Sequence, residues 1–440
     1  MFGRRKALVT VVAGLLASGC GGSDDPPREL LGAYRFADGR VVSLRPSLDG
    51  TLRHREFGTG ASGRLYPDGD SRWVGGAGFS DREPRDLTVE FERGEDGLAR
   101  SLRWTRQASS TEVATRIGRE SWLTFSSDGT ELAGRLHLPD GDGPYPAIVL
   151  VHGSGETPGS RWLYDGDFFV AHGIAVLAFD KRGTGASGGD STFDFDRLAR
   201  DVAAAVDVVR THPAIDGERI GIAGYSQGGW VAPLAASMTS VRFVIAAYGL
   251  VESPAEEARQ EMLDRLRLAN VDSVSLAAAD SLIVAAIDVV ASGFEAGWER
   301  FDALKQRYGR TPWRDHLRGT PVDRLLRRPR WMVKIVGPRL APPGLDWNYD
   351  SVALLDTLDV PTVWFLGDED RSAPNDGTQK ILRSLRARGR PIEIHVYEDA
   401  DHGMLLFEQT DGVRRYTGYA ADFWHDEVDA ARRHLAREGR

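Results

Sequence analysis

A serine flanked by glycines, within residues 224–228, is the part of this sequence that most directly suggests chemistry. The segment reads Gly-Tyr-Ser-Gln-Gly, follows an apolar run over 219–223 that we expect to be a strand, and precedes a helical pattern over 230–238. In such a strand–turn–helix unit the serine projects from a strained turn as a nucleophile. Gly224 and Gly228 agree with this, because a side chain at either position would collide with the neighbouring strand and helix. We therefore predict that Ser226 is a nucleophile.

A serine hydroxyl needs a base to accept its proton and a carboxylate to orient that base. His402 follows the apolar run 392–397, and Asp370 follows the run 361–366. These residues complete the chain order serine, acid, histidine. Asp370 is favoured as the acid because a glycine lies three residues before it and a proline four residues after it. The other carboxylates of these two loops are interpreted as loop charges: Asp368, Glu369, Asp399 and Asp401.

The loop after the apolar run 146–151 is expected to bind the negative charge that develops in the reaction. It reads His-Gly-Ser-Gly over 152–155, at a place where such a sheet supplies one donor of an oxyanion hole. We predict that the two donors are the backbone N–H groups of Ser154 and Gln227. His152 precedes the serine and so falls outside the catalytic order. We interpret it as structural, fixing the loop at Gly153 through hydrogen bonds.

The elements that must position these residues are strands alternating with helices. Short, continuous β-branched runs recur from residue 146 to residue 397, as expected for strands buried on both faces of a parallel sheet. Between them lie patterns with apolar residues every three or four positions. This alternation predicts a doubly wound, mostly parallel α/β sheet over 119–440. Residues 251–350 are too long for a simple crossover, so we expect a helical lid inserted there.

A separate β domain is predicted over residues 29–115. Period-two alternation around Asp-Gly turns indicates hairpins, and their spacing suggests a small antiparallel sandwich or partial barrel. Residues 105–120 are polar and lack periodicity, so the domain boundary is placed there. The domain carries no recognisable catalytic group, which favours a packing or spacer role over binding a substrate or partner.

The N-terminus has the pattern of an export signal. Basic residues at positions 4–6 precede an apolar run over 7–16, which is long enough for a signal peptide and too short to span a membrane. The run ends at Cys20, the only cysteine, in a segment that resembles the lipobox of bacterial lipoproteins, although alanine stands at position 17 where leucine is usual. The resemblance implies a signal peptide over 1–19, a lipidated Cys20 and a flexible tether over 20–28, and hence an exported lipoprotein anchored to a membrane of the cell envelope (periplasm or outer membrane).

Composition excludes several other classes of protein. The chain of 440 residues has 41% hydrophobic and 27% charged residues, as soluble globular proteins do. Its net charge of −9 argues against nucleic acid as a partner. One cysteine allows no intrachain disulfide, and no histidine pair has the spacing of a metal motif, so we expect no metal.

Three motifs together are similar to the α/β-hydrolase superfamily: 151–155, the Asp-Lys-Arg-Gly-Thr-Gly-Ala-Ser run at 180–187, and 224–229. The chain most resembles bacterial esterases allied to dienelactone hydrolase and prolyl oligopeptidase, from residue 121 to the C-terminus apart from the lid. The resemblance implies hydrolysis of a small-molecule carboxylic ester without a cofactor. Peptidase or acyl-amino-acid hydrolase activity is the enzymatic alternative, and a non-catalytic binding lipoprotein is another. An arginine-rich stretch over 318–339 is interpreted as a solvated helix face, or else as a grip for a substrate carboxylate.

Overall fold

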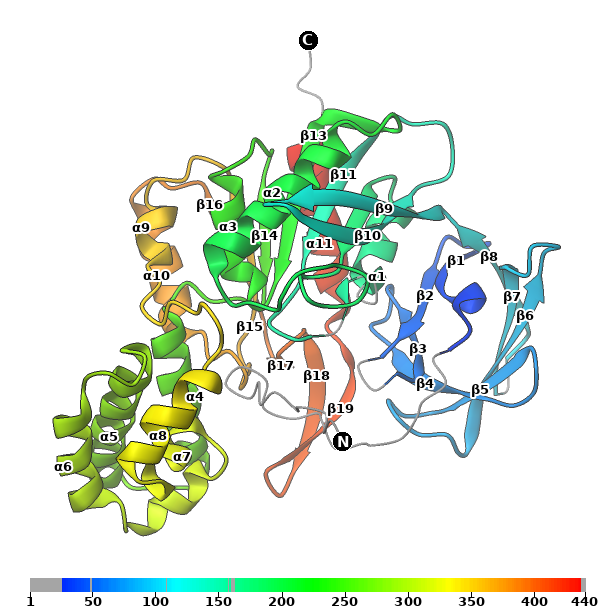
Figure 1. Cartoon of the computed structure of the whole chain (residues 1–440). Coiled ribbons are helices and arrows are strands. Elements are labelled where there is room, and N and C mark those ends of the chain that lie inside the picture. The colour runs from blue at the N-terminus through cyan, green and yellow to red at the C-terminus, as the bar shows by residue number, and fades with distance from the viewer. Residues whose placement is uncertain (1–25, 48–49, 108, 157, 160–162, 437–440) are drawn as a thin grey trace, which may run out of the picture.

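The computed structural model describes residues 26–47, 50–107, 109–156, 158–159 and 163–436. It contains a β barrel, a central sheet domain and a helical lid, with the barrel and the lid on opposite sides of the central domain (Figure 1). The predicted signal peptide, Cys20 and most of the tether lie outside the described residues.

The N-terminal domain is a closed barrel in which β1 pairs with both β2 and β8. The predicted antiparallel β domain is present, but it is a closed barrel, where the sequence suggested a sandwich or a partial barrel. A short helix η1 (Arg28–Leu30) precedes the strands β1 (Gly32–Phe36), β2 (Val41–Pro46), β3 (Leu52–Glu56), β4 (Ser62–Pro67), β5 (Arg72–Gly76), β6 (Arg85–Arg93), β7 (Ala99–Arg106) and β8 (Glu112–Ile117).

The predicted domain boundary over 105–120 is too broad. Strand β8 lies in this stretch and closes the barrel, so a single residue, Gly118, separates the barrel from the next strand. Only Ala114 and Ile117 of β8 are buried. A strand with so few buried side chains shows little apolar alternation, which is why the sequence pattern missed it.

The central domain has the predicted α/β-hydrolase fold. Eight strands form one sheet in the order β16-β15-β14-β13-β11-β12-β10-β9, antiparallel only where β10 pairs with β9 and β12. The strands are β9 (Arg119–Ser127), β10 (Thr130–Leu138), β11 (Tyr145–Val151), β12 (Ala175–Phe179), β13 (Ile215–Tyr225), β14 (Val244–Ala247), β15 (Thr362–Gly367) and β16 (Ile392–Tyr397). The flanking helices are α1 (Leu163–Ala171), α2 (Phe195–Arg210), α3 (Gly228–Ala236), α10 (Asp376–Ala387) and α11 (Ala421–Leu435).

The lid lies between β14 and β15 and has its own hydrophobic core, to which Leu282, Phe301 and Trp313 belong. Its elements are α4 (Pro254–Leu268), α5 (Ser273–Ala291), α6 (Trp298–Tyr308), η3 (Pro312–Leu317), α7 (Pro321–Arg327), α8 (Arg330–Val336) and η4 (Gly337–Arg339), followed by α9 (Ser351–Leu355). By length and composition alone α5 could cross a membrane. In the structure one side of it, which includes Leu282, Ile283 and Ala286, packs in the lid core, and 39% of its apolar window is buried.

A three-stranded sheet flanks the predicted catalytic histidine, His402, with one strand before it and two after it. It consists of β17 (Ala400–Asp401), β18 (Leu405–Thr410) and β19 (Val413–Tyr419), and the long β18–β19 hairpin extends below the main sheet, between the barrel and the lid (Figure 1). The hairpin contacts the barrel through the Tyr419 N–H, which donates to the Gly60 carbonyl at 2.9 Å. The loop that carries His402 is therefore connected to the barrel.

Candidate active site

The turn that carries Ser226 has the strained geometry expected of a nucleophile. Ser226 has φ 55°, in the left-handed region that side chains other than glycine rarely adopt. A Cβ atom at Gly224 would lie 2.3 Å from the Gly228 carbonyl oxygen, and one at Gly228 would lie 2.9 Å from that of Val151. The Ser226 N–H donates to the Ala247 carbonyl at 3.0 Å. Glycine at both positions is thus what lets β13 turn directly into α3.

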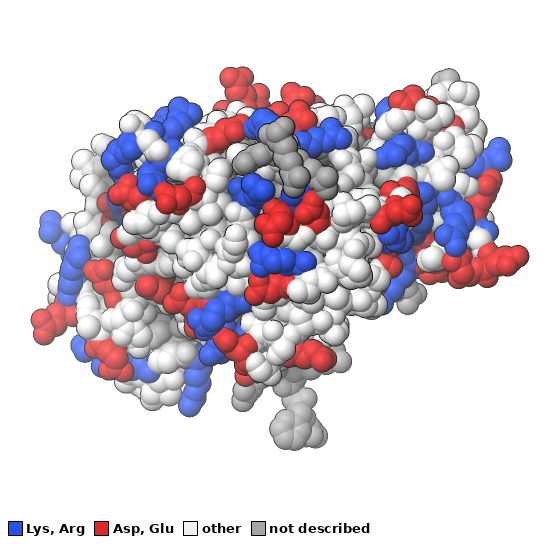
Figure 2. All heavy atoms as spheres, turned by 90° about the horizontal axis from the view of Figure 1, so that it is seen from above, with Lys and Arg blue, Asp and Glu red and all other residues white. Residues whose placement is uncertain are grey.

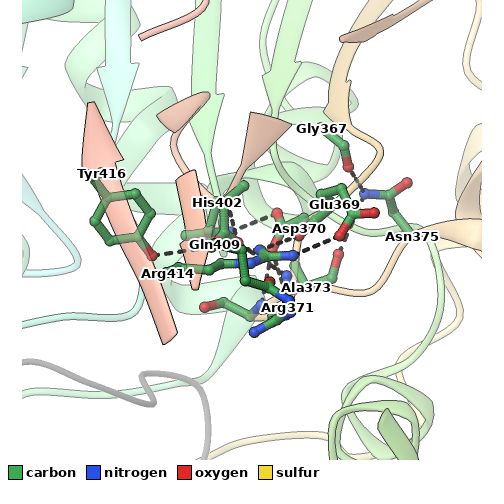
Figure 3. A network of polar contacts seen from close by, with 12 residues as sticks. Gly367, Glu369, Asp370, Arg371, Ala373, Asn375, His402, Gln409, Arg414 and Tyr416 are labelled. Atoms are coloured by element: carbon green, nitrogen blue, oxygen red, sulfur yellow. Dashed lines mark hydrogen bonds and ion pairs between the residues drawn. The ribbon is translucent and has the colours of Figure 1, made fainter. Parts of the chain in front are cut away.

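Asp370 and His402 come together at the carboxyl ends of β15 and β16. His402 Nδ1 lies 2.8 Å from Asp370 Oδ2, and the other carboxylate oxygen accepts the N–H groups of Ser372 at 2.9 Å and Ala373 at 2.7 Å (Figure 3). Burial alone lowers the pKa of His402, but the adjacent Asp370 outweighs burial and raises that pKa above its ordinary value. The pair has the geometry of a base held in one tautomer, with Nε2 left as the acceptor.

The other carboxylates in these loops are exposed loop charges, except for Asp401, which is buried and makes polar contacts. Asp368 and Glu369 are exposed, as expected. Asp401 does not touch the imidazole ring; its Oδ1 accepts the N–H of His402 at 2.8 Å, and its Oδ2 lies 2.7 Å from Nη1 of the buried Arg414 on β19. Asp401 therefore ties the histidine loop to the β18–β19 hairpin.

His402 is connected to the serine turn through Tyr248. The two rings contact edge to face, with centroids 5.0 Å apart. Tyr248 directly follows Ala247, whose carbonyl accepts the N–H of Ser226. The serine turn, Tyr248 and the Asp370–His402 pair thus meet at one edge of the sheet, where ligands bind in open α/β sheets.

The predicted oxyanion loop lies beside the serine. A Cβ atom at Gly153 would lie 3.9 Å from Ser226 Oγ. His152 Nδ1 lies 3.1 Å from the Gly153 carbonyl oxygen, and because a carbonyl only accepts, Nδ1 carries the proton. Burial, together with Lys181, lowers the pKa of His152 to about 3. His152 is therefore neutral at ordinary pH and fixes the loop by a hydrogen bond, as predicted from the sequence.

Lys181 is a part of the site that the sequence analysis did not single out. Its Nζ donates to the Ser154 carbonyl at 3.0 Å and reaches the Gly153 carbonyl at 3.5 Å. In a planar trans peptide the carbonyl of residue 153 and the N–H of residue 154 point in opposite directions. Lys181 holds the Gly153 carbonyl on its own side of this peptide bond. The Ser154 N–H therefore points to the opposite side, away from Lys181. Burial lowers the pKa of Lys181 to about 8, against an opposing effect of Glu156.

A signal for Lys181 does exist in the sequence. The residue follows strand β12 almost directly, so it had to lie at the same sheet edge as the 152–155 loop. Lysine is rarely buried unless it is paired, and this one is 1% exposed. Its role was hidden because both of its partners are backbone carbonyls, and these leave no mark in a sequence.

One group of described residues has metal-ligand geometry, and it lies away from this site. Ligand atoms of Glu120, His137 and Asp167 are within 4.8 Å of one another between the barrel and α1. The guanidinium of Arg45 already occupies this place, with Nε 2.9 Å and Nη2 2.6 Å from the two oxygens of Asp167. We interpret the group as a buried ion pair at a domain interface.

Comparison with known proteins supports the same fold. The sequence profile described as "Alpha/beta hydrolase family" matches residues 148–415. The chain is 35% identical over 133 residues to the thiohydrolase aneE of Aspergillus aculeatus, covering 30% of this chain and 41% of that protein. It is 27% identical over 200 residues to the esterase EstD of Thermotoga maritima, covering 41% and 47%.

Among solved structures, the acylaminoacyl peptidase of Pyrococcus horikoshii aligns with a TM-score of 0.44 and 16% identity, covering 91% of this chain and 57% of that one. The aligned segments span less than half the length of the two curated relatives. The family profile covers more than half of the sequence, including all the residues of the site described above. The chain belongs to the alpha/beta hydrolase family.

Proposed function

We propose that the chain is a serine hydrolase that cleaves carboxylic esters, with Ser226 as nucleophile, His402 as general base and Asp370 as the residue that orients the base. The observation that carries the proposal is the 2.8 Å contact between His402 Nδ1 and Asp370 Oδ2, at the same sheet edge as a serine held at φ 55°. A histidine with one nitrogen bound to a buried carboxylate is prepared to accept a proton on the other.

The chemistry proceeds in two halves. Ser226 Oγ attacks the ester carbonyl as its proton moves to His402 Nε2, and the new negative charge on oxygen is held by the N–H groups of Ser154 and Gln227. The C–O bond to the alcohol then breaks, and the alcohol leaves with the proton from His402. Water repeats the sequence on the acyl-serine, which releases the acid and restores Ser226. No step needs a cofactor.

Esters are proposed ahead of amides because esters are intrinsically easier to cleave, and because one relative is named an esterase and another a thiohydrolase. Peptide or acyl-amino-acid hydrolysis is the competing outcome of the experiment. A non-catalytic binding role fits poorly with a nucleophile turn, an acid–base pair and an oxyanion loop that meet at one sheet edge.

The test uses the chain from residue 20 onward with Cys20→Ser, assayed on p-nitrophenyl acetate and butyrate beside aminoacyl p-nitroanilides. Ester turnover that falls by about 10⁶ in Ser226→Ala supports the proposal, since that is the scale of nucleophile removal. Anilide turnover with weak ester cleavage would move the assignment to a peptidase. If a fluorophosphonate probe gives no adduct at Ser226, the enzymatic function itself is wrong.

The N-terminal pattern supports a second proposal, that the chain is exported and anchored by a lipid on Cys20. Mass spectrometry of the full chain expressed in a bacterial host is expected to show an acylated mature N-terminus at residue 20, with the protein in the membrane fraction. Cys20→Ser should release it to the soluble fraction. A mature N-terminus at another residue without acyl mass would overturn the proposal.

A further inference from the structure

A patch of apolar and basic side chains on the lid helix α8 and the η4 turn that follows it has no part in the proposed function. Three large apolar side chains are exposed there: Trp331 by 64%, Ile335 by 56% and Leu340 by 38%. Arg330, Lys334 and Arg339 are exposed beside them. We call these six residues the α8 patch.

The two kinds of side chain form adjacent rows. Residues four apart lie on the same side of a helix, so Trp331 and Ile335 make one row and Arg330 and Lys334 make the row next to it. Val333 is buried and holds the opposite side of α8 against the lid core. The exposed side of the helix is therefore divided lengthwise into an apolar strip and a cationic strip.

The positive charge is local. Residues 318–340 contain seven basic side chains and one acid, Asp323, whereas the whole chain has a net charge of −9. Arg318, Arg327 and Arg330 each have a carboxylate within 4.0 Å. Within the α8 patch, Lys334 and Arg339 therefore contribute most of the unbalanced charge. On the face of the molecule seen in Figure 2, basic and acidic side chains are interspersed. The α8 patch, which carries charge of one sign, differs from that face.

We propose that the α8 patch docks on a lipid bilayer that contains anionic phospholipid. Tryptophan and aliphatic side chains beside lysine and arginine are the composition of helices that lie in the interface of a membrane. The apolar row would enter the acyl boundary, and the cations would face the phosphates. A seven-residue helix is about 10 Å long, too small for the roughly 800 Å² that each partner buries in a stable protein interface. Docking of one helix on a bilayer does not require a buried area of that size.

Docking through α8 would orient the molecule with its lid against the membrane, independently of any lipid on Cys20. It also gives a role to three basic residues of the stretch 318–339, Arg330, Lys334 and Arg339, without assigning them to a substrate carboxylate.

The test measures sedimentation of the chain from residue 20 onward, carrying Cys20→Ser, with vesicles of phosphatidylcholine alone or with phosphatidylglycerol. We expect binding to the anionic vesicles that weakens with salt, and little binding to phosphatidylcholine. Trp331→Ser with Ile335→Ser, and separately Lys334→Glu, should each weaken binding at least tenfold. The matched controls are Trp122→Ser, which removes an exposed tryptophan from β9, and Lys380→Glu on α10; both should bind as the parent does.

Several results would overturn the proposal. No binding to anionic vesicles would do so, as would equal loss in the patch variants and the controls. If the patch variants keep vesicle binding but change KM for a soluble ester, the patch belongs to the substrate entrance. If polyglutamate binds the patch and vesicles do not, the partner is an acidic protein. None of these outcomes bears on the role of Ser226 as nucleophile, which Ser226→Ala tests separately, so the docking proposal can fail while the proposed function stands.

Discussion

The barrel and the lid are both additions to the same sheet domain, yet they are attached in different ways. The barrel shares a hydrophobic core with the central domain: Phe57 packs on Phe168 at 4.6 Å and on Trp424 at 4.9 Å between ring centroids. At the same interface Arg45 is buried against Asp167 of α1. The lid core, in contrast, is formed within residues 255–347 and contains no strand of the main sheet.

The two additions are therefore coupled to the central domain to different degrees. A domain that shares its core and its buried charges with a neighbour cannot separate from it without exposing both. A segment with its own core can move or unfold locally at a lower cost than global unfolding. The barrel is therefore expected to unfold together with the catalytic domain, and the lid by itself.

Arg45→Met gives the largest expected change in stability. It leaves Asp167 buried without its main partner, and breaking a buried pair typically costs about 3–5 kcal/mol. Urea denaturation followed by hydrogen exchange of the barrel and main-sheet amides should show that both lose protection in one transition at a lower midpoint. Arg40→Met, which removes the exposed pair with Glu112, is the control and should lie close to the parent. Two separate transitions in Arg45→Met would show that the barrel is an independent unit.

The pH dependence of that effect follows from Asp167. Burial alone raises its pKa, but Arg45 and His137 outweigh burial and hold the pKa of Asp167 below its ordinary value. A carboxyl with a depressed folded-state pKa adds stability above the unfolded value, near 3.9, and loses it as pH falls. The stability gap between the parent and Arg45→Met should therefore shrink below about pH 4. A gap that grows on acidification would contradict this assignment.

Phe301→Ala tests the lid. This side chain is fully buried in the lid core, and removing such a phenylalanine typically costs about 3–5 kcal/mol. Because the loss stays within the lid, we expect an added low-denaturant transition in hydrogen exchange over 255–347, with the barrel unchanged. Val274→Ala, at a site 79% exposed, is the control. If exchange of the barrel amides rises equally, the lid is as tightly coupled as the barrel.

Lys181→Met changes the central domain, to which the barrel and the lid are attached. It should lower the rate of ester hydrolysis without loosening either the barrel or the lid. Loss of a full oxyanion donor costs about 10²–10³ in kcat, and loss of the residue that orients one should cost about tenfold to a hundredfold, with KM nearly unchanged. In the parent the lysine loses its charge as pH rises through about 8, so kcat should fall there. That basic limb should disappear in the variant, while the acidic limb of His402 remains. An unchanged pH profile would show that Lys181 has only a structural role.

The smallest effect is expected from Arg300→Met, which removes an exposed lid ion pair with Asp288. Both side chains are more than half exposed, and such pairs contribute roughly 0.2–1 kcal/mol. The change should appear only in the lid transition, if at all. A loss above about 2 kcal/mol would mean that surface charges, rather than the apolar core, hold the lid together.

The sequence predicted those features that depend on local pattern or chain order. The serine turn, the loop glycines and the Asp370–His402 pairing follow from residue types next to buried strands, and the structure brings them to one sheet edge. The position of Lys181 after a buried strand places it at this edge, but the sequence could not predict its role, because its partners are backbone carbonyls. Nor could it predict Tyr248, whose contact with His402 depends on how two loops pack. Closure of the barrel also depends on pairing between β1 and β8, which are about eighty residues apart, and long-range pairing has no local signature.

Barrel closure limits the ways in which one copy of the chain can associate with another through strand pairing. An open sheet ends in strands whose free N–H and C=O groups can recruit a strand from another molecule and start aggregation. Because β8 pairs with both β7 and β1, this domain has no such edge. The barrel therefore adds eight strands to the central domain without adding a sheet edge at which a second copy could pair. Of the barrel and the main sheet, only the main sheet keeps open edges, at β9 and β16.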